Sequence, residues 1–187
     1  MKKIVLIILL GIGLWCACTE EKPGYYRGGT GLNFYYDQIG PYDSNPYFGE
    51  GIDGRDSMTY VSSVKERDTL WFRIMVYGEK LTEERGFSLK QSVLSHLDST
   101  AYINDSTTVA VEGVNFVPFD DPEIRQYCVI HPDSSSVYVP VIATYDPAMV
   151  GQYKRFKLFF EIVPSEDISI FDSRFYRAEL NMRQLAE

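Results

Sequence analysis

The sequence predicts an all-β protein, folded as an antiparallel β-sandwich of about seven strands. Several segments alternate apolar and polar side chains with a period of two, which is the pattern of a strand with one buried face. Turns rich in Gly, Pro, Asp and Ser join these segments. Little helix is expected. Asp146 to Tyr153 can form one turn, because Asp146 is a suitable cap and Pro147 suits the first helical position.

The strands can be placed along the chain from this pattern. The first strand is expected at residues 31–36, before an irregular loop at 37–57. The others are expected at 58–64, 69–77, 86–94, 124–131, 136–144, 154–163 and 173–183. Alternation is clearest in three strands, whose predicted core-facing residues are Leu70, Phe72, Ile74 and Val76; Phe156, Leu158, Phe160 and Ile162; and Tyr176, Ala178, Leu180 and Met182. The residues predicted on the opposite faces include Arg73; Lys157 and Glu161; and Arg177, Glu179, Asn181 and Arg183.

The segment Ala110–Phe116 is interpreted as structural. Gly113 allows a sharp turn with a positive φ. Ala110 and Val114 are small enough for the crossing chain to lie against a sheet, and Phe116 is expected to fill the core.

The amino terminus combines a basic start with an apolar run. Lys2 and Lys3 precede Ile4–Trp15, a nearly unbroken apolar run of 12 residues. A membrane-spanning helix needs roughly 20 apolar residues, so this run is short for an anchor and typical of a signal peptide. A buried helix or a first strand of the domain is the alternative.

Two cysteines follow this run and define the kind of signal. Lipoprotein signal peptides end with a small residue before the cysteine that receives the lipid. Ala17 before Cys18 fits this requirement, whereas the residue before Cys16 is a tryptophan. A Cys16–Cys18 pair that binds metal or forms a disulfide is the alternative, but further ligands are missing nearby. The predicted organisation is a lipoprotein signal peptide at 1–17, a lipidated cysteine and tether at 18–30, and a single sandwich domain at 31–187.

The charge of the chain limits its partners. The sequence has 18 basic and 26 acidic residues and a net charge of −8, which becomes −10 if Lys2 and Lys3 leave with the signal peptide. No basic cluster stands out along the sequence, so no nucleic-acid binding is expected. An acidic surface repels anionic headgroups, so membrane attachment is expected to come through the lipid.

The sequence contains no recognisable catalytic or metal-binding constellation. Cys128 is the lone cysteine of the body and lies in an apolar stretch, which predicts a buried, inert thiol rather than a nucleophile. His96 and His131 lie in no pattern typical of a catalytic triad. The acidic pairs lack the spacing of an EF-hand loop. We therefore expect no catalytic residue, metal or cofactor.

Several segments together carry a resemblance to a known family. In chain order they are Asp68–Phe72, Val76–Gly78, Arg85–Leu89, Thr108–Phe116, Tyr138–Val141 and Leu158–Asp167. This succession resembles an uncharacterised family of Bacteroidetes lipoproteins whose genes often lie beside SusC/SusD-like nutrient-uptake systems. The resemblance covers roughly residues 30–170, and it implies an immunoglobulin-like sandwich reminiscent of Calx-β domains.

The resemblance also implies a location. In Bacteroidetes, acidic residues directly after the lipid-bearing cysteine resemble the signal for export to the outer face of the outer membrane. Glu20 and Glu21 follow Cys18 closely. We therefore expect an outer-membrane protein, anchored by lipid and facing the cell exterior.

Two classes of function are compatible with the sequence. Tyr42, Tyr47 and Phe48 lie in the irregular loop, and exposed rings can stack on the apolar faces of sugars. The same rings can instead cover the end of the core. The preferred function is a non-enzymatic surface lipoprotein that binds a glycan or peptide, or supports a SusC/SusD-like uptake complex. A small surface hydrolase, or an inhibitor of one, is the alternative.

Overall fold

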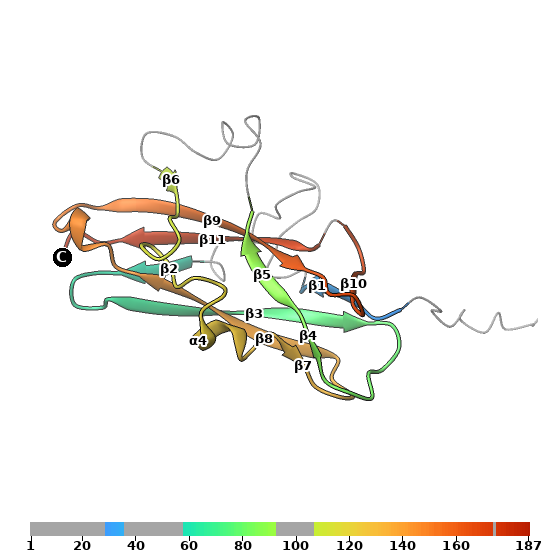
Figure 1. Ribbon diagram of the computed structural model, residues 1–187. Helices are drawn as coiled ribbons and strands as arrows, with labels where there is room; N and C mark the ends of the chain where they lie inside the picture. Colours follow the sequence, from blue (N-terminus) through green and yellow to red (C-terminus); the bar gives the residue numbers. More distant parts are fainter. Residues whose placement is uncertain (1–28, 36–57, 93–106, 174) are drawn as a thin grey trace, which may run out of the picture.

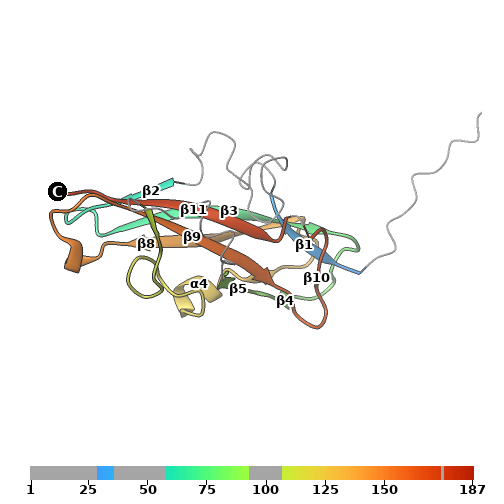
Figure 2. The same ribbon diagram turned by 90° about the horizontal axis from the view of Figure 1, so that it is seen from above.

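The computed structural model describes residues 29–35, 58–92, 107–173 and 175–187. The predicted signal peptide, most of the predicted tether and the aromatic loop lie outside these residues. The described residues form two facing β-sheets with little helix, which confirms the predicted β-sandwich (Figures 1 and 2). No helix in this part of the chain is long and apolar enough to cross a membrane.

Two sheets contain most of the strands. The strands are β1 (Gly31–Phe34), β2 (Met58–Val61), β3 (Arg67–Tyr77), β4 (Arg85–Gly86), β5 (Ser88–Gln91), β6 (Thr107–Val109), β7 (Val129–Ile130), β8 (Ser136–Thr144), β9 (Lys154–Val163), β10 (Ser169–Ile170) and β11 (Arg177–Gln184). Sheet A has the order β10-β1-β3-β8, and sheet B has the order β2-β11-β9-β5, with β6 also beside β9. β4 and β7 form a separate pair.

Strand pairing is mostly antiparallel, as predicted. The long pairs β3–β8 and β9–β11 are antiparallel and make up the largest part of each sheet. Three short pairs are parallel, namely β1–β10, β2–β11 and β6–β9. Parallel neighbours require a crossover of the chain, so period-two alternation within one strand could not reveal them.

The core lies between the two sheets and is rich in phenylalanine. Phe160 of β9 packs edge-on against Phe34 and Phe72 of sheet A, at ring-centroid distances of 5.4 and 4.9 Å. Phe119 lies 5.4 Å from the same ring. Edge-to-face pairs of this kind add to the stabilisation from burying the rings. The predicted inward positions of the three alternating strands are therefore confirmed, except that Tyr176 precedes β11 and is half-buried.

The outer face of sheet B departs from simple alternation at two paired residues, Glu179 of β11 and Phe159 of β9, which are both buried. Glu179 of β11 was predicted on the solvent side, but only 5% of it is exposed. Its Oε1 lies 2.6 Å from the Nζ of Lys157 on β9, and this ion pair compensates for the loss of water.

The strand predicted at 124–131 is wrong in its first half. The helix α4 (Pro122–Arg125) occupies this region, and β7 begins only at Val129. The side chain of Asp121 accepts a hydrogen bond from the backbone N–H of Glu123, and Pro122 supplies a helix-compatible φ. This Asp-Pro start is the same signal that correctly predicted the turn at 146–153.

That second turn is confirmed as a short 3-10 helix, η2 (Pro147–Met149), capped by the side chain of Asp146. Gln184 at the end of β11 holds it in place. The Gln184 side chain is fully buried, accepts a hydrogen bond from the Asp146 N–H and donates one to the Asp146 carbonyl, at 2.8 and 2.9 Å.

Other predicted boundaries move by a few residues. The segment predicted as one strand at 86–94 is divided between β4 and β5, which belong to different sheets, and residues 93 and 94 lie outside the described part. The last strand begins at Arg177 rather than at 173. Gly113 has the predicted positive φ of 74°, and Phe116 is fully buried as expected, but Val114 is exposed. The turn at Gly113 points Val114 away from the sheet.

Cys128 is buried between α4 and β7, with 4% of its surface exposed, as predicted for an inert thiol. Burial raises the pKa of the Cys128 thiol from 9.0 to about 11, against a smaller opposing effect of the Arg125 charge.

This raised pKa predicts a loss of stability in alkaline solution. Between pH 9 and 11 the thiol ionises in the unfolded chain but stays protonated in the folded one, so the unfolded state is favoured as pH rises. The free energy of unfolding should therefore fall by about 2–3 kcal/mol more in the wild type than in Cys128→Ala. Urea unfolding at pH 8 to 11 measures this difference, and parallel curves for the two proteins would contradict it.

Candidate functional site

The residues proposed from the sequence as functional are not described by the structure. Cys18, Tyr42, Tyr47 and Phe48 lie outside the described residues, so their roles stay predictions. His131 is exposed, and its Nδ1 lies 2.8 Å from the Glu84 carboxylate, which is an ordinary surface contact. The described part holds no group of three or more residues arranged to bind a metal ion.

The outer face of sheet A, by contrast, carries many aromatic side chains. Phe72 and Ile74 of β3 face the core, so Trp71, Arg73 and Tyr77 point to the other side of the sheet. Cross-strand pairing adds the aromatic residue Tyr138 of β8 opposite Arg73. β3 and β8 run side by side along the length of the sandwich (Figure 1).

Trp71 forms one end of this surface. It is 42% exposed, and its ring lies 5.0 Å from the ring of Tyr127 in an edge-to-face arrangement. The short helix α4 brings Tyr127 here, because Ile124 anchors α4 in the core and Tyr127 lies in the segment between α4 and β7. Trp71 lies opposite Pro140, which is tolerated because β8 is the last strand in the order of sheet A.

Arg73 occupies the middle of the surface between two tyrosines. Its guanidinium carbon lies 4.8 Å from the ring centre of Tyr35 and 5.9 Å from that of Tyr138. These cation–π contacts hold the Tyr138 ring, which is 51% exposed, above the sheet.

Tyr77 and Phe171 form the other end. Their rings are stacked, with centroids 4.4 Å apart. Gly31 of β1 makes this possible, because a Cβ at that position would lie only 2.9 Å from the Cα of Phe171. The segment after β10 can therefore fold closely over the sheet.

We call these six residues the aromatic row: Tyr35, Trp71, Tyr77, Tyr127, Tyr138 and Phe171. From Trp71 to Tyr77 the strand extends by roughly 20 Å, at about 3.4 Å per residue. Rings held on a regular sheet need little reordering when a ligand binds. Such a surface is suited to the apolar C–H faces of a chain of sugar rings.

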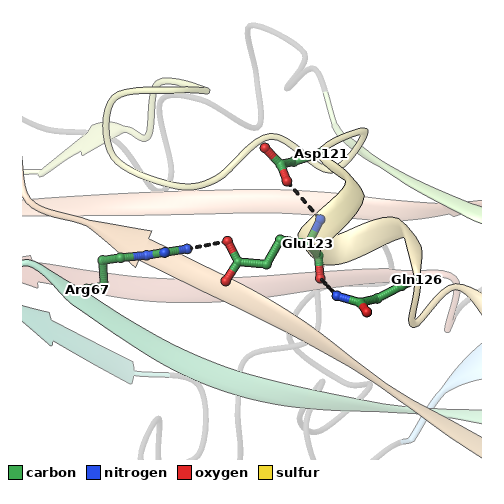
Figure 3. Close-up of polar contacts among 4 residues, drawn as sticks. All are labelled: Arg67, Asp121, Glu123 and Gln126. Carbon is green, nitrogen blue, oxygen red and sulfur yellow. Dashed lines mark hydrogen bonds and ion pairs between the residues drawn. The ribbon is translucent and has the colours of Figure 1, made fainter.

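A cleft lies on the same side of β3, beyond Trp71. Its volume is about 540 Å³, and a neighbouring hollow of about 510 Å³ shares part of its wall. The residues common to both are Arg67, Thr144, Tyr145 and Pro147. Figure 3 shows the charged groups at this cleft, where Arg67 of β3 reaches towards the helix α4.

The charged groups of the cleft are held by structural contacts. A nitrogen of Arg67 lies 2.7 Å from the Glu123 carboxylate, and the Asp121 carboxylate caps α4 (Figure 3). The amide of Gln126 donates to the Glu123 carbonyl at 3.0 Å. Two carboxylates engaged in an ion pair and a helix cap give no support to the hydrolase alternative, which needs an acid and a base directed at a substrate.

Comparison with known proteins gives likenesses of fold. No family model matches the chain, and no curated protein matches it. The Calx CBD1 domain has a TM-score of 0.44 and 8% identity, with coverage of 84% of this chain and 99% of that domain. The EndoBT-3987 of Bacteroides thetaiotamicron, solved with a Man5GlcNAc product, has a TM-score of 0.47 and 12% identity, with coverage of 70% and 29%. A candidate carbohydrate-binding protein from Bacteroides ovatus has a TM-score of 0.40 and 12% identity, with coverage of 68% and 35%.

The aromatic row was missed by the sequence analysis, although part of its signal is visible. In the alternating segment 69–77, Phe72 and Ile74 belong to the predicted core-facing positions. Trp71 and Tyr77 belong to the alternate, solvent-facing positions, where polar residues are usual. Large rings that gather on the solvent-facing side of a sheet are typical of a binding surface. Tyr127 and Phe171, however, reach this face only through the tertiary fold.

Proposed function

We propose that this protein is a non-enzymatic glycan-binding component of the cell surface, held by a lipid on Cys18. The observation that carries the proposal is the aromatic row on the outer face of sheet A. Its members come from β3, β8 and the segments beside β1, α4 and β10, so several distant parts of the chain contribute rings to one face. We further propose that it serves a SusC/SusD-like uptake system as an accessory that captures or presents glycans.

The expected affinity is modest. One aromatic contact contributes roughly 0.5–1.5 kcal/mol, by analogy with aromatic pairs in proteins. Three or four such contacts offset only part of the entropy that is lost on association, so a dissociation constant in the micromolar to millimolar range is expected. Weak, reversible binding suits a component that passes its ligand on.

Direct binding tests this proposal. The soluble chain beginning at Thr19 retains every described residue and can be screened by calorimetry against neutral glycans. The panel consists of neutral N-glycan fragments and other neutral oligosaccharides. Saturable binding of at least one glycan supports the proposal. No binding across the panel, or turnover of a glycan that a single carboxylate substitution abolishes, would overturn it.

The lipid anchor gives a separate prediction. Cells fed a clickable palmitate should label the wild-type protein, and the Cys18→Ala variant should lose the label, because no other cysteine precedes the body once Cys16 leaves with the signal peptide. Gel fluorescence measures the labelling. Cys16→Ala is the matched control and should stay labelled, whereas label retained by Cys18→Ala would show that the attachment site is wrong.

A further inference from the structure

Two arginines lie directly opposite each other on the outer face of sheet B. Arg183 of β11 pairs with Arg155 of β9 in the antiparallel register, and their neighbours Met182 and Phe156 face the core. The Cβ atoms of directly opposed residues are about 4.5–5.5 Å apart. Like charges in this position repel each other and destabilise the sheet.

Neither arginine is neutralised by a carboxylate in the described part of the chain. The polar contact of Arg155 is a hydrogen bond of 3.2 Å from its Nε to the Tyr153 hydroxyl. Elsewhere on the same face the cations are paired, since Glu161 lies 3.0 Å from both Lys90 and Arg177. The Arg155–Arg183 pair is therefore a local excess of positive charge in a chain whose net charge is −8.

An exposed ring flanks each arginine. Tyr60 of β2 lies beside Arg183 in the parallel register, and the guanidinium carbon of Arg183 is 5.6 Å from its ring centre. Arg155 is 5.7 Å from the ring centre of Tyr153. Tyr60 and Tyr153 are 41% and 48% exposed. Tyr60, Arg183 and Arg155 therefore follow one another across β2, β11 and β9, and Tyr153 lies just before β9, two residues along the chain from Arg155.

A small hollow lies at this pair. Its volume is about 120 Å³, roughly that of four water molecules in the liquid. Its side-chain lining comes from four neighbouring strands, β2, β6, β9 and β11, and includes Met58, Thr107, Arg155, Lys157, Asn181 and Arg183. The hollow fits one small anionic group, with guanidinium and amide donors around it.

We propose that the Arg155–Arg183 pair binds a carboxylate or sulfate group of an acidic polysaccharide, with Tyr60 and Tyr153 against the sugar rings. A guanidinium presents a planar pair of N–H donors that matches a carboxylate or sulfate with two hydrogen bonds. A bound anion also removes the repulsion between the two arginines. This site lies on the sheet opposite to the aromatic row and does not depend on the function proposed for that row.

The arrangement favours a sugar over an anionic membrane surface. Binding to anionic lipids relies on clusters of four to eight lysines or arginines, and this hollow has three cations, of which Lys157 is already paired with Glu179. The overall negative charge of the chain opposes attraction to a charged bilayer over longer distances. Recognition must therefore be local, which suits a single acidic group between two rings.

The test compares acidic and neutral polysaccharides on the soluble chain from Thr19. Calorimetry with trigalacturonate and with a sulfated oligosaccharide separates the carboxylate from the sulfate, and maltotriose is the neutral probe. We expect at least one acidic probe to bind and the Arg155→Gln/Arg183→Gln variant to lose at least tenfold in affinity. Arg155→Lys/Arg183→Lys keeps the charge but not the planar donor pair, and should lose a smaller factor. Melting curves verify that each variant folds.

A charge-matched control separates a site from general electrostatics. Lys80→Gln/Arg125→Gln removes the same two charges from exposed positions elsewhere and should change the affinity less than twofold. Trp71→Ala should also leave binding of the acidic probe unchanged, which distinguishes this site from the aromatic row. Failure of both acidic probes to bind, an equal loss in the control, or arginine-dependent binding to phosphatidylglycerol vesicles without binding to either sugar would overturn the proposal.

Discussion

Replacing Trp71 with alanine is expected to weaken the binding of a neutral glycan about tenfold. The substitution removes the ring of Trp71 and also the edge contact that holds Tyr127, whose centroid lies 5.0 Å away. Two stacking contacts at roughly 0.5–1.5 kcal/mol each contribute about 1–3 kcal/mol together, a range that includes the 1.4 kcal/mol of a tenfold change. Trp71→Phe keeps an aromatic ring at this position and should retain most of the affinity.

Fluorescence gives this experiment an independent measurement. The sequence contains two tryptophans, Trp15 and Trp71, so a soluble chain from Thr19 has Trp71 as its sole tryptophan. A glycan that stacks on the aromatic row should change the intensity or wavelength of tryptophan emission, with the same dissociation constant that calorimetry gives.

The control is an exposed apolar side chain outside both proposed sites. Val64→Ala, in the turn between β2 and β3, changes a side chain that is 87% exposed and should change the affinity for a neutral glycan less than twofold. If Trp71→Ala binds the glycan as well as the wild type, and the emission does not respond, the aromatic row is not the binding surface.

Replacing Phe160 with alanine is expected to destabilise the domain by about 3–5 kcal/mol. The ring is fully buried and contacts Phe34, Phe72 and Phe119 at centroid distances of 4.9 to 5.4 Å. Its loss leaves a cavity between the two sheets that the rigid strands cannot fill. Because small domains are stable by about 5–15 kcal/mol, this single change should lower the melting temperature markedly.

Urea unfolding of the soluble chain measures the effect. Val150→Ala, at a largely exposed position beside η2, is the control and should shift the free energy of unfolding by less than about 0.5 kcal/mol. A cost below 1.5 kcal/mol for Phe160→Ala would mean that Phe160 does not form the centre of the core.

Several elements could be predicted because their cause is local. The inward positions of β3 and β9 follow from the alternation of side chains across a pleated strand. This alternation is a property of the single strand and does not depend on which strands lie beside it. The cap at Asp146 depends on one side chain and the following proline. The strand predicted at 124–131 was wrong because apolar residues outweighed the equally local signal of Asp121 and Pro122.

Other features depend on contacts that no local pattern encodes. β1 has β10 as a parallel neighbour, and the sequence between them is more than 130 residues long. The burial of Glu179 is acceptable only because Lys157 lies on the same face of the sheet, diagonally across from it on β9. The loop around Tyr42, Tyr47 and Phe48, preferred from its composition, lies outside the described residues, so its role stays a prediction.

The sequence by itself determined the all-β class, the buried and exposed faces of the main strands, and the buried thiol at Cys128. These properties follow from the period of the side chains and from hydrophobicity, which act over a few residues. Only the tertiary structure decided which exposed side chains lie together. No basic cluster is visible along the chain, yet pairing of β9 with β11 places Arg155 beside Arg183. Alternation fixes the face on which a side chain lies, whereas its neighbours on that face are set by strand order and register, which depend on the packing of the whole domain.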